Sequence, residues 1–259
     1  MKIRGYQMVN IFVNSTVLAE AYLVMVCVIP IVREQNYVMD CKINYSWMDY
    51  HISIFRFFRC NYHAFVNIIS DEKLDLVFLL DGSTSITNAG FQDAKLFIKK
   101  LYSNFPIGEY STHVGLVVFG EESKTIFDLI EYTDKQTLDM KLPLLLKYDS
   151  SGNFLGRGLQ TVKKNVYDVS ARPGGHQVLV IIAAGSSQDD VKAPSRDLRD
   201  EGVRIFCVGI GNNVDVNQLQ NVVTAPEREH LATVSSDKLD TLLGPVVQNI
   251  RKGKNKFDF

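Results

Sequence analysis

The sequence lacks the short motifs that mark many nucleotide-binding and zinc-binding proteins. It has no Gly-rich phosphate loop, no cluster of Cys and His at zinc-binding spacing, and no third glycine at dinucleotide spacing after Gly209 and Gly211. It also has no internal repeat and no low-complexity tract. These absences argue against a nucleotide-dependent enzyme, a zinc module and a repeat protein.

The net charge of the chain is also small, and long apolar runs are few. The formal net charge of -1 gives no general attraction to nucleic acid, so we expect no nucleic-acid partner. The apolar stretch at residues 17–32 is interrupted by Glu20 and is shorter than a typical membrane span. With Lys2 and Arg4 upstream, it is typical of a signal peptide or signal anchor with a long N-terminal region. Membrane contact is expected only if this segment acts as an anchor.

Cysteine is infrequent, and its four positions leave the redox compartment open. Cys27 lies in the predicted leader, and Cys207 lies in a predicted core strand, where a free thiol packs as a small apolar group. Cys41 and Cys60 could form a disulfide if the chain is exported. Residues 41–69 show no clear hydrophobic period, so the segment 1–70 is treated as a signal-like leader followed by a stretch without a predicted fold.

The remainder of the chain alternates apolar runs with amphipathic segments. Continuous apolar runs predict buried strands, and the alternating run at residues 124–129 predicts a more exposed edge strand after a hairpin. The predicted strands cover residues 76–80, 113–120, 177–185, 203–211 and 231–234, and the predicted helices cover residues 91–102, 193–201 and 237–251. This order predicts an α/β fold: a doubly wound, mostly parallel sheet flanked by helices, with one antiparallel edge strand. We assign the domain to residues 71–252 and a polar tail to residues 253–259.

Asp81, Ser83 and Ser85 directly follow the first buried strand. Their carboxylate and hydroxyl oxygens are ligands that Mg²⁺ prefers, and they lie where open α/β sheets bind ligands. The Asp-x-Ser-x-Ser spacing resembles the von Willebrand factor A domain, whose metal ion-dependent adhesion site opens with this motif. The resemblance covers roughly residues 71–251 and includes the strand that ends in Val-Gly-Ile-Gly at Gly211.

The resemblance implies a set of metal ligands that this chain matches only in part. In the family, the two serines coordinate the ion directly, a threonine in a second loop adds a ligand, and an aspartate after the fourth strand acts through water. Asp81, Ser83 and Ser85 match this set. Asn153 stands near the expected threonine, and Ala184 stands at the expected aspartate.

Two interpretations of this incomplete site remain open. A divalent cation could still bind if the amide oxygen of Asn153 replaces the threonine, with further help from Ser150, Ser151, Asp189 or Asp190. Alternatively, Asp81, Ser83 and Ser85 hydrogen-bond one another and nearby loop amides, and the loop persists without an ion. An acidic rim that could attract cations or a basic partner is predicted at the same edge, from Asp81, Glu121, Glu122, Asp149, Asp189 and Asp190.

The resemblance implies a secreted, extracellular module for protein binding and adhesion. It would recognise a matrix protein such as collagen, with Mg²⁺ or another divalent cation as the candidate cofactor. The alternative is a structural matrix component that self-associates and has no metal-dependent ligand. No histidine is paired by sequence context with Asp81 or Ser83, so we predict that the chain is not an enzyme.

Overall fold

The chain divides into two compact units, residues 1–71 and 72–259. The computed structural model describes residues 73–146, 148 and 152–252, together with the backbone of five strands between residues 2 and 61. Those five strands form an antiparallel sheet in chain order: β1 (Lys2–Ile3), β2 (Tyr6–Val13), β3 (Ala21–Pro30), β4 (Val38–Trp47) and β5 (Tyr50–Asn61). Sequence analysis assigned no fold to this segment, because its apolar and polar residues do not alternate regularly enough to indicate strands.

Part of the predicted leader, residues 21–30, forms β3. Cys27, Cys41 and Cys60 lie on strands of this unit, but their side chains fall outside the described residues. The pairing of Cys41 with Cys60 therefore stays a prediction. In the described part of the chain, no helix is both long and apolar enough to cross a membrane.

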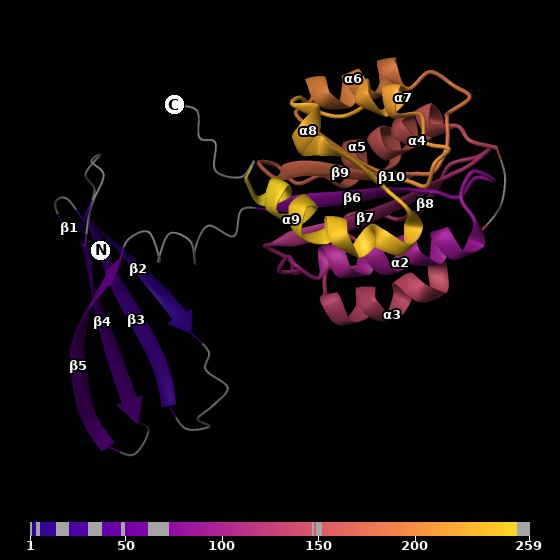
Figure 1. Ribbon diagram of the computed structural model, residues 1–259. Coiled ribbons are helices and arrows are strands. Elements are labelled where there is room, and N and C mark those ends of the chain that lie inside the picture. Colours follow the sequence, from indigo (N-terminus) through magenta and orange to yellow (C-terminus); the bar gives the residue numbers. More distant parts are fainter. Residues whose placement is uncertain are drawn as a thin grey trace. The chain divides into compact units, whose positions relative to one another are not determined.

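The second unit is built on a six-stranded sheet with the order β11-β10-β9-β6-β7-β8 (Figure 1). Every neighbouring pair is parallel except β7 with β8, which is antiparallel. The strands are β6 (Leu74–Asp81), β7 (Thr112–Phe119), β8 (Lys124–Phe127), β9 (His176–Ala183), β10 (Arg204–Ile210) and β11 (Leu231–Val234). The predicted fold class, including its antiparallel edge strand, is confirmed.

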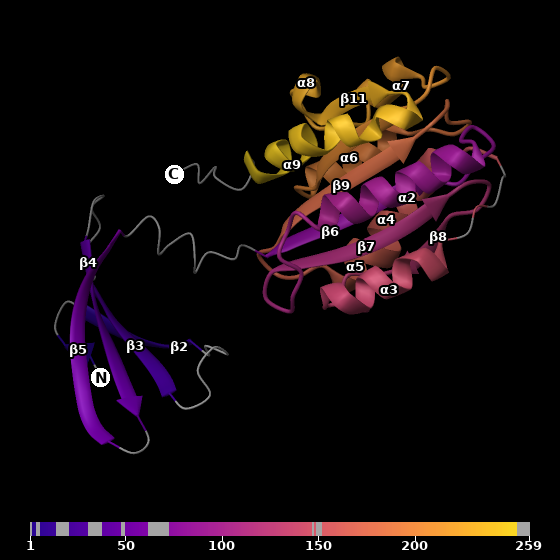
Figure 2. The same ribbon diagram turned by 60° about the horizontal axis from the view of Figure 1, so that its bottom comes forward.

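Helices cover both faces of this sheet (Figures 1 and 2). One face carries α2 (Asn88–Tyr102), α3 (Lys135–Leu145) and α9 (Leu243–Lys252). The other carries α4 (Leu155–Val162), which continues through η1 (Lys163–Tyr167) and α5 (Asp168–Ser170), and also α6 (Lys192–Asp200) and α7 (Val216–Gln220). The short α8 (Glu227–His230) leads into β11, and η2 (Ser236–Leu242) leads into α9.

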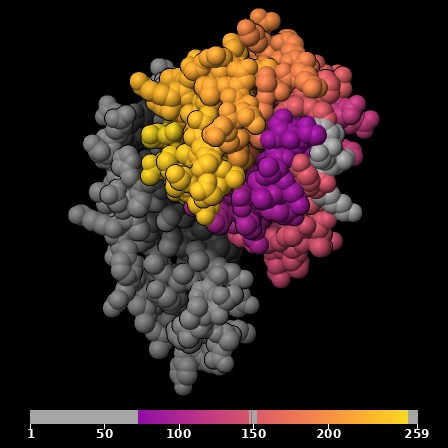
Figure 3. All heavy atoms as spheres, turned by 45° about the vertical axis from the view of Figure 1, so that its right-hand side comes forward, coloured from indigo at the N-terminus to yellow at the C-terminus, as the bar shows by residue number. Residues whose placement is uncertain are grey.

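Two hydrophobic clusters hold these layers together. On β6, Phe78 and Leu80 face the α2 side of the sheet, whereas Val77 and Leu79 face the α4 side. A central parallel strand buried on both faces explains why the sequence is apolar without alternation there. The yellow atoms of α9 lie beside the purple atoms of α2 on one face of the molecule (Figure 3), where Ile250 joins the same cluster as Phe97.

The structure corrects the prediction of one helix across residues 237–251. A 3₁₀ helix, η2, ends at Leu242, and the α-helix begins only at Leu243. Pro245 accounts for the break, because a proline lacks the N–H that a continuous α-helix would need and is tolerated in a first turn. The helix α3 was not predicted, because it buries only Leu138 and Leu142 and contains Pro143.

At the N-terminal edge of the sheet, a buried ion pair joins β6 to the segment before β9. Asp75 is fully buried, and its carboxylate accepts hydrogen bonds of 2.7 Å from the Arg172 Nε and 2.8 Å from the Arg172 backbone N–H. The same guanidinium donates through Nη2 to the carbonyls of Leu74 and Ser111. This edge is therefore held together by one cation and the acceptors that surround it.

We expect Arg172→Met to lower the free energy of unfolding by about 3 kcal/mol, because it leaves the buried Asp75 carboxylate without its counter-charge. Urea unfolding followed by the helical circular dichroism signal would measure this. Arg196→Met is the matched control: Arg196 is exposed on α6, and the change should stay within about 0.5 kcal/mol. Equal effects of the two substitutions would contradict the structural role of Arg172.

Candidate functional site

The site begins at the C-terminal end of β6, where the chain leaves the sheet. Asp81, the last residue of the strand, is fully buried. Its Oδ1 accepts the Ser83 N–H at 2.8 Å, and its Oδ2 accepts the Ala184 N–H at 2.9 Å. Since Ala184 follows β9, Asp81 joins the two strands between which the chain order reverses. Open α/β sheets bind ligands at this switch point.

Burial raises the pKa of the Asp81 carboxyl, because a charged group is poorly solvated inside the protein. Hydrogen bonds from Ser83 and Ala184 stabilise the charged form and oppose this rise. The donors that reach Asp81 are neutral amides and hydroxyls, and no cationic side chain contributes to the shift. The carboxylate is therefore matched by dipoles rather than by an opposite charge.

Asn153 lies just before α4, and neighbouring loops fix its backbone. The Asn153 carbonyl accepts the Gln188 N–H at 2.9 Å, and the next residue, Phe154, donates its N–H to the Gly120 carbonyl at 3.1 Å. These two bonds connect the segment to the loops that follow β9 and β7. The Asn153 side chain is thereby held over the end of β6, and the residue is only 5% exposed.

The structure brings together the four residues predicted for the metal site, and the Asn153 amide lies at their centre. Its Nδ2 is within hydrogen-bonding distance of three oxygens: Ser83 Oγ at 3.2 Å, Ser85 Oγ at 3.3 Å and Asp81 Oδ2 at 3.4 Å. The Ser83 Oγ also accepts the Ser85 N–H at 3.1 Å. The Asn153 Oδ1 is buried and has no hydrogen-bond partner in the described part of the chain.

As arranged here, these residues do not fit a divalent cation. A cation such as Mg²⁺ requires oxygen lone pairs around it, whereas the amide nitrogen that faces the three oxygens is only a donor. The residue after β9, where the family has its aspartate, is Ala184, which is 3% exposed and packs in the core on the α2 side. Among the described residues, no group of three or more His, Cys, Asp or Glu side chains could hold a metal ion, so any site here would depend on the serine hydroxyls.

Two carboxylates of the predicted acidic rim, those of Asp189 and Asp190, cap helices. Asp189 accepts the N–H groups of Gly156 and Arg157, both at 2.8 Å, and so caps the N-terminus of α4. Asp190 accepts the N–H groups of Lys192 and Ala193 at the start of α6. Both carboxylates thus cap helices, and their contribution to a metal site through water stays a prediction. Asp149, Ser150 and Ser151 lie outside the described residues.

Close backbone contact brings the loop after β9 against the serine loop. A Cβ added to Gly185 would lie 2.3 Å from Ser85 Oγ and 2.5 Å from Ser85 Cβ. Similarly, a Cβ on Gly82 would lie 2.7 Å from a methyl carbon of Val118. Glycine is therefore required at these two positions because the loops pass so close to other atoms.

A groove of about 710 Å³ opens beside the site at the same edge of the sheet. It combines apolar and charged side chains from three segments: Gly82, Val118, Phe119, Gly120, Glu121, Glu122, Lys124, Ile126, Leu145 and Tyr148. The Tyr148 hydroxyl donates to the Ile86 carbonyl at 2.7 Å, and its ring packs on Phe91, so this wall is anchored to α2. Glu121 and Glu122 were expected at this edge, whereas Leu145 and Tyr148 were not. Leu145 is the last residue of α3, a helix that the sequence did not predict, and Tyr148 follows it.

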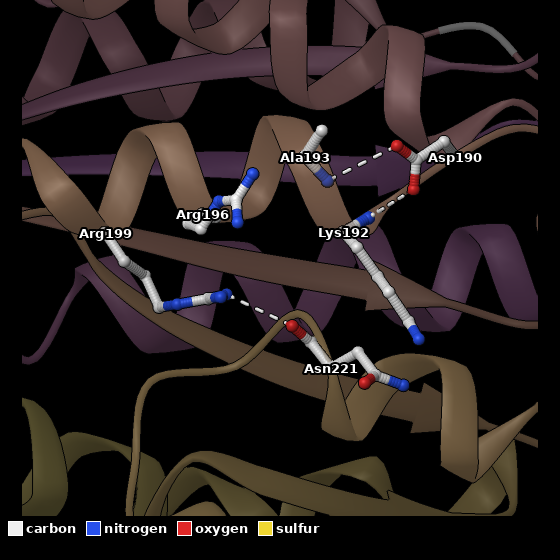
Figure 4. Close-up of a pocket in the computed structure, with 6 residues that line it drawn as sticks. All are labelled: Asp190, Lys192, Ala193, Arg196, Arg199 and Asn221. Atoms are coloured by element: carbon white, nitrogen blue, oxygen red, sulfur yellow. Dashed lines mark hydrogen bonds between the residues drawn. The ribbon is translucent and has the colours of Figure 1, made fainter.

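A second, smaller hollow of about 380 Å³ lies along α6 (Figure 4). Lys192, Arg196 and Arg199 line it, together with Asp190, Ala193 and Asn221. Arg199 donates to the backbone carbonyls of Asn221 and Val222, which ties α6 to the end of α7. The cationic side chains therefore share this hollow with a carboxylate and serve in part to hold helices together.

The histidines of the second unit lie away from the Asp81 site. His113 and His176 lie at the N-terminal ends of their strands, where their Cα partners on β6 are Asp75 and Leu74. His230 is buried against Phe206, and its Nδ1 lies 3.0 Å from the Pro226 carbonyl. Burial lowers the pKa of both His113 and His230, which favours their neutral form. Cys207 is a buried free thiol, as predicted, and burial raises its pKa above the usual range.

A doubly wound α/β sheet with a cluster of polar loops at its switch point is the architecture in which open α/β domains bind ligands. Comparison with known proteins then gives the family. The family model of the von Willebrand factor type A domain matches residues 75–244. The chain belongs to this family.

The curated relatives include proteins named as collagen and matrilin chains. The human collagen alpha-5(VI) chain is 34% identical over 153 residues, which are 59% of this chain and 6% of the collagen chain. Matrilin-1 from Gallus gallus is 30% identical over 163 residues, which are 62% of this chain and 33% of matrilin-1. The chain thus spans about a third or less of the length of these relatives.

Among solved structures, the proximal thread matrix protein 1 from the mussel byssus superposes with a TM-score of 0.63 and 25% identity. The match covers 68% of this chain and 46% of the mussel protein. Another structure of that protein, with zinc in its metal ion-dependent adhesion site, superposes with a TM-score of 0.63 at 24% identity and covers 70% of this chain and 48% of that one. These likenesses establish the shared fold, and the zinc is a property of the mussel protein.

We expect Gly185→Ala to lower the free energy of unfolding by about 1 to 3 kcal/mol, because the added methyl overlaps Ser85. Gly244→Ala is the control: Gly244 lies in α9 with no atom near its added Cβ, so alanine should stabilise the helix by about 0.5 to 1 kcal/mol. Thermal or urea unfolding of both variants measures the difference. If Gly185→Ala leaves the free energy of unfolding unchanged, the loop after β9 does not approach the serine loop as closely as described.

Proposed function

We propose that the chain is an extracellular module that binds a matrix protein such as collagen and has no catalytic role. Family membership supports this, since relatives in the same family are named as collagen and matrilin chains. The observation that favours binding is the groove at the C-terminal edge, which lies beside the family's adhesion loops and is open to a partner. Secretion is part of this proposal, because a matrix partner is met outside the cell.

The groove suggests the kind of contact that a partner would make. Apolar side chains, among them Ile126 and Leu145, line its walls, and Glu122 is exposed at its margin. Such a surface suits a partner with an apolar ridge beside a basic side chain, because rim carboxylates accelerate the approach of positive charge. We propose that this contact forms without a bridging ion. A partner carboxylate held by Mg²⁺ or another divalent cation is the alternative.

We expect Glu122→Lys to slow association of the full-length chain with immobilised collagen by about threefold to tenfold, with a weaker salt dependence than the native chain. Surface plasmon resonance in the presence of chelator measures this. Asp200→Lys is the control, since Asp200 is an exposed acidic residue at the end of α6 and lines no part of the groove. If both variants bind like the native chain, the groove is not the contact surface. If the native chain binds no matrix protein, the proposed function is wrong.

A second candidate function is self-association in a matrix assembly, and the surface of α3 favours it. Met140 and Leu144 lie one turn apart on this helix and are 56% and 70% exposed. Neighbouring exposed apolar side chains on a helix are typical of a surface that another protein covers. A second copy of this chain is the partner that this candidate requires.

For self-association we expect a concentration-dependent increase in mass in sedimentation equilibrium, unchanged by chelator. Leu144→Glu should abolish it, because a charge would have to be buried at the contact. Val169→Glu is a matched control, since Val169 is similarly exposed, at 68%, but lies in α5 on the opposite face of the sheet. A native chain that remains monomeric at the highest concentration would exclude this candidate.

A further inference from the structure

We propose that the Asn153 side-chain amide takes the place of the divalent cation at this edge, so that the loop cluster is closed without such an ion and does not bind one. The inference concerns the edge assigned to partner binding, but it does not depend on the identity of the partner. Its basis is the position of one atom, Asn153 Nδ2, among three oxygens of the serine loop.

Three side-chain oxygens converge on one position in the loop cluster. The Asp81 Oδ2, Ser83 Oγ and Ser85 Oγ all point at one position, and Nδ2 occupies it at 3.2 to 3.4 Å from each. These distances lie at the long end of N–H···O hydrogen bonds and are far longer than the distance of about 2.0 to 2.1 Å of a Mg²⁺–oxygen contact. An ion at that position would have to displace the nitrogen. The neighbouring loops hold the backbone here, through Gln188 to the Asn153 carbonyl and through Gly120 to the Phe154 N–H.

The Asn153 amide turns its nitrogen, not its oxygen, toward the cluster. An ionised Asp81 is only an acceptor, so the amide nitrogen is attracted to it, whereas the amide oxygen would be repelled. Turning the amide over would bring Oδ1 against this carboxylate. The observed orientation persists although it leaves Oδ1 buried without a partner in the described region. Three acceptors therefore surround the nitrogen, which is the arrangement that an amide donor satisfies.

Among the described residues, the loop after β9 brings no second carboxylate to Asp81. In a buried site, each added negative charge makes a divalent cation more favourable and an empty site less stable. Here Ala184 contributes only a backbone N–H, which stabilises Asp81 without adding charge. A single carboxylate with three neutral partners, Ser83, Ala184 and Asn153, is a balanced arrangement in the absence of an ion. Compared with the threonine and aspartate that the family resemblance implies, Asn153 and Ala184 thus both make a bound cation less favourable.

The test is the thermal stability of the full-length chain in chelator, in Mg²⁺ and in Mn²⁺. We expect the native Tm to be the same in all three. Asn153→Asp replaces the donor nitrogen by an oxygen with almost no change in shape. It should lower the Tm in chelator and restore it with Mn²⁺. The control is Asn165→Asp, at an exposed position in η1, which should not respond to either ion.

A second variant keeps the test decisive if Asn153→Asp does not fold. Asn153→Thr combined with Ala184→Asp rebuilds the oxygen set that the family resemblance implies. It should gain about 5 to 10 °C in Tm at an ion concentration about a hundred times its Kd. In nuclear magnetic resonance spectra, the native Asn153 side-chain amide should exchange slowly with solvent. Mn²⁺ should leave that signal unbroadened.

Two results would overturn the inference. One is a rise in the native Tm with Mg²⁺ or Mn²⁺ that Asp81→Ala abolishes, since this would show a working cation site. The other is an Asn153→Asp variant that responds to Mn²⁺ no more than Asn165→Asp. The proposed function is tested separately. Matrix binding that requires a cation would refute this inference and leave the proposed function standing. A native chain that binds no matrix ligand would refute the proposed function and leave this inference standing.

Discussion

A buried carboxylate must be matched by donors, and the C-terminal edge of the second unit is organised around this requirement at Asp81. The residue lies at the end of the central strand β6, fully buried, where a parallel sheet places it between the loops after β7 and β9. Its partners come from three separate segments, namely Ser83, Asn153 and Ala184. Because one carboxylate receives bonds from all three, it fixes their spacing, and a change in any one of them alters the others.

Each edge of the sheet contains a buried carboxylate, and the two carboxylates are stabilised in different ways. At the N-terminal edge, the buried Asp75 is paired with the guanidinium of Arg172, a full positive charge. At the C-terminal edge, the donors to Asp81 among the described residues are all neutral, and burial raises the pKa of its carboxyl. In this fold family, a cation at the C-terminal edge would supply the missing charge. In place of a cation, the Asn153 amide offers the partial positive charge of its N–H groups. This is sufficient to stabilise Asp81 because Ala184 adds no second carboxylate to be neutralised.

Much of this architecture was predictable, and the exceptions have physical causes. Continuous apolar runs identify β6, β9 and β10 because a parallel sheet covered on both faces tolerates little polarity. The helix α3 was not predicted because it buries few residues. The groove wall at Tyr148, which follows this helix, was therefore not predicted either. The position of Asn153 near the site followed from family resemblance. Which atom of its amide faces inward did not, because that depends on three oxygens that come together only in the folded chain.

The nature of the central group determines what the edge can offer a partner. A bound cation keeps an open coordination position that a carboxylate of the partner can fill. The Asn153 Nδ2 has two N–H bonds, and both are directed into the cluster of Asp81, Ser83 and Ser85. Under the proposed function, the partner would then contact the side chains around the groove rather than the loop cluster. Recognition of that kind depends on apolar fit and on exposed charge such as that of Glu122. It is therefore sensitive to salt and indifferent to chelation.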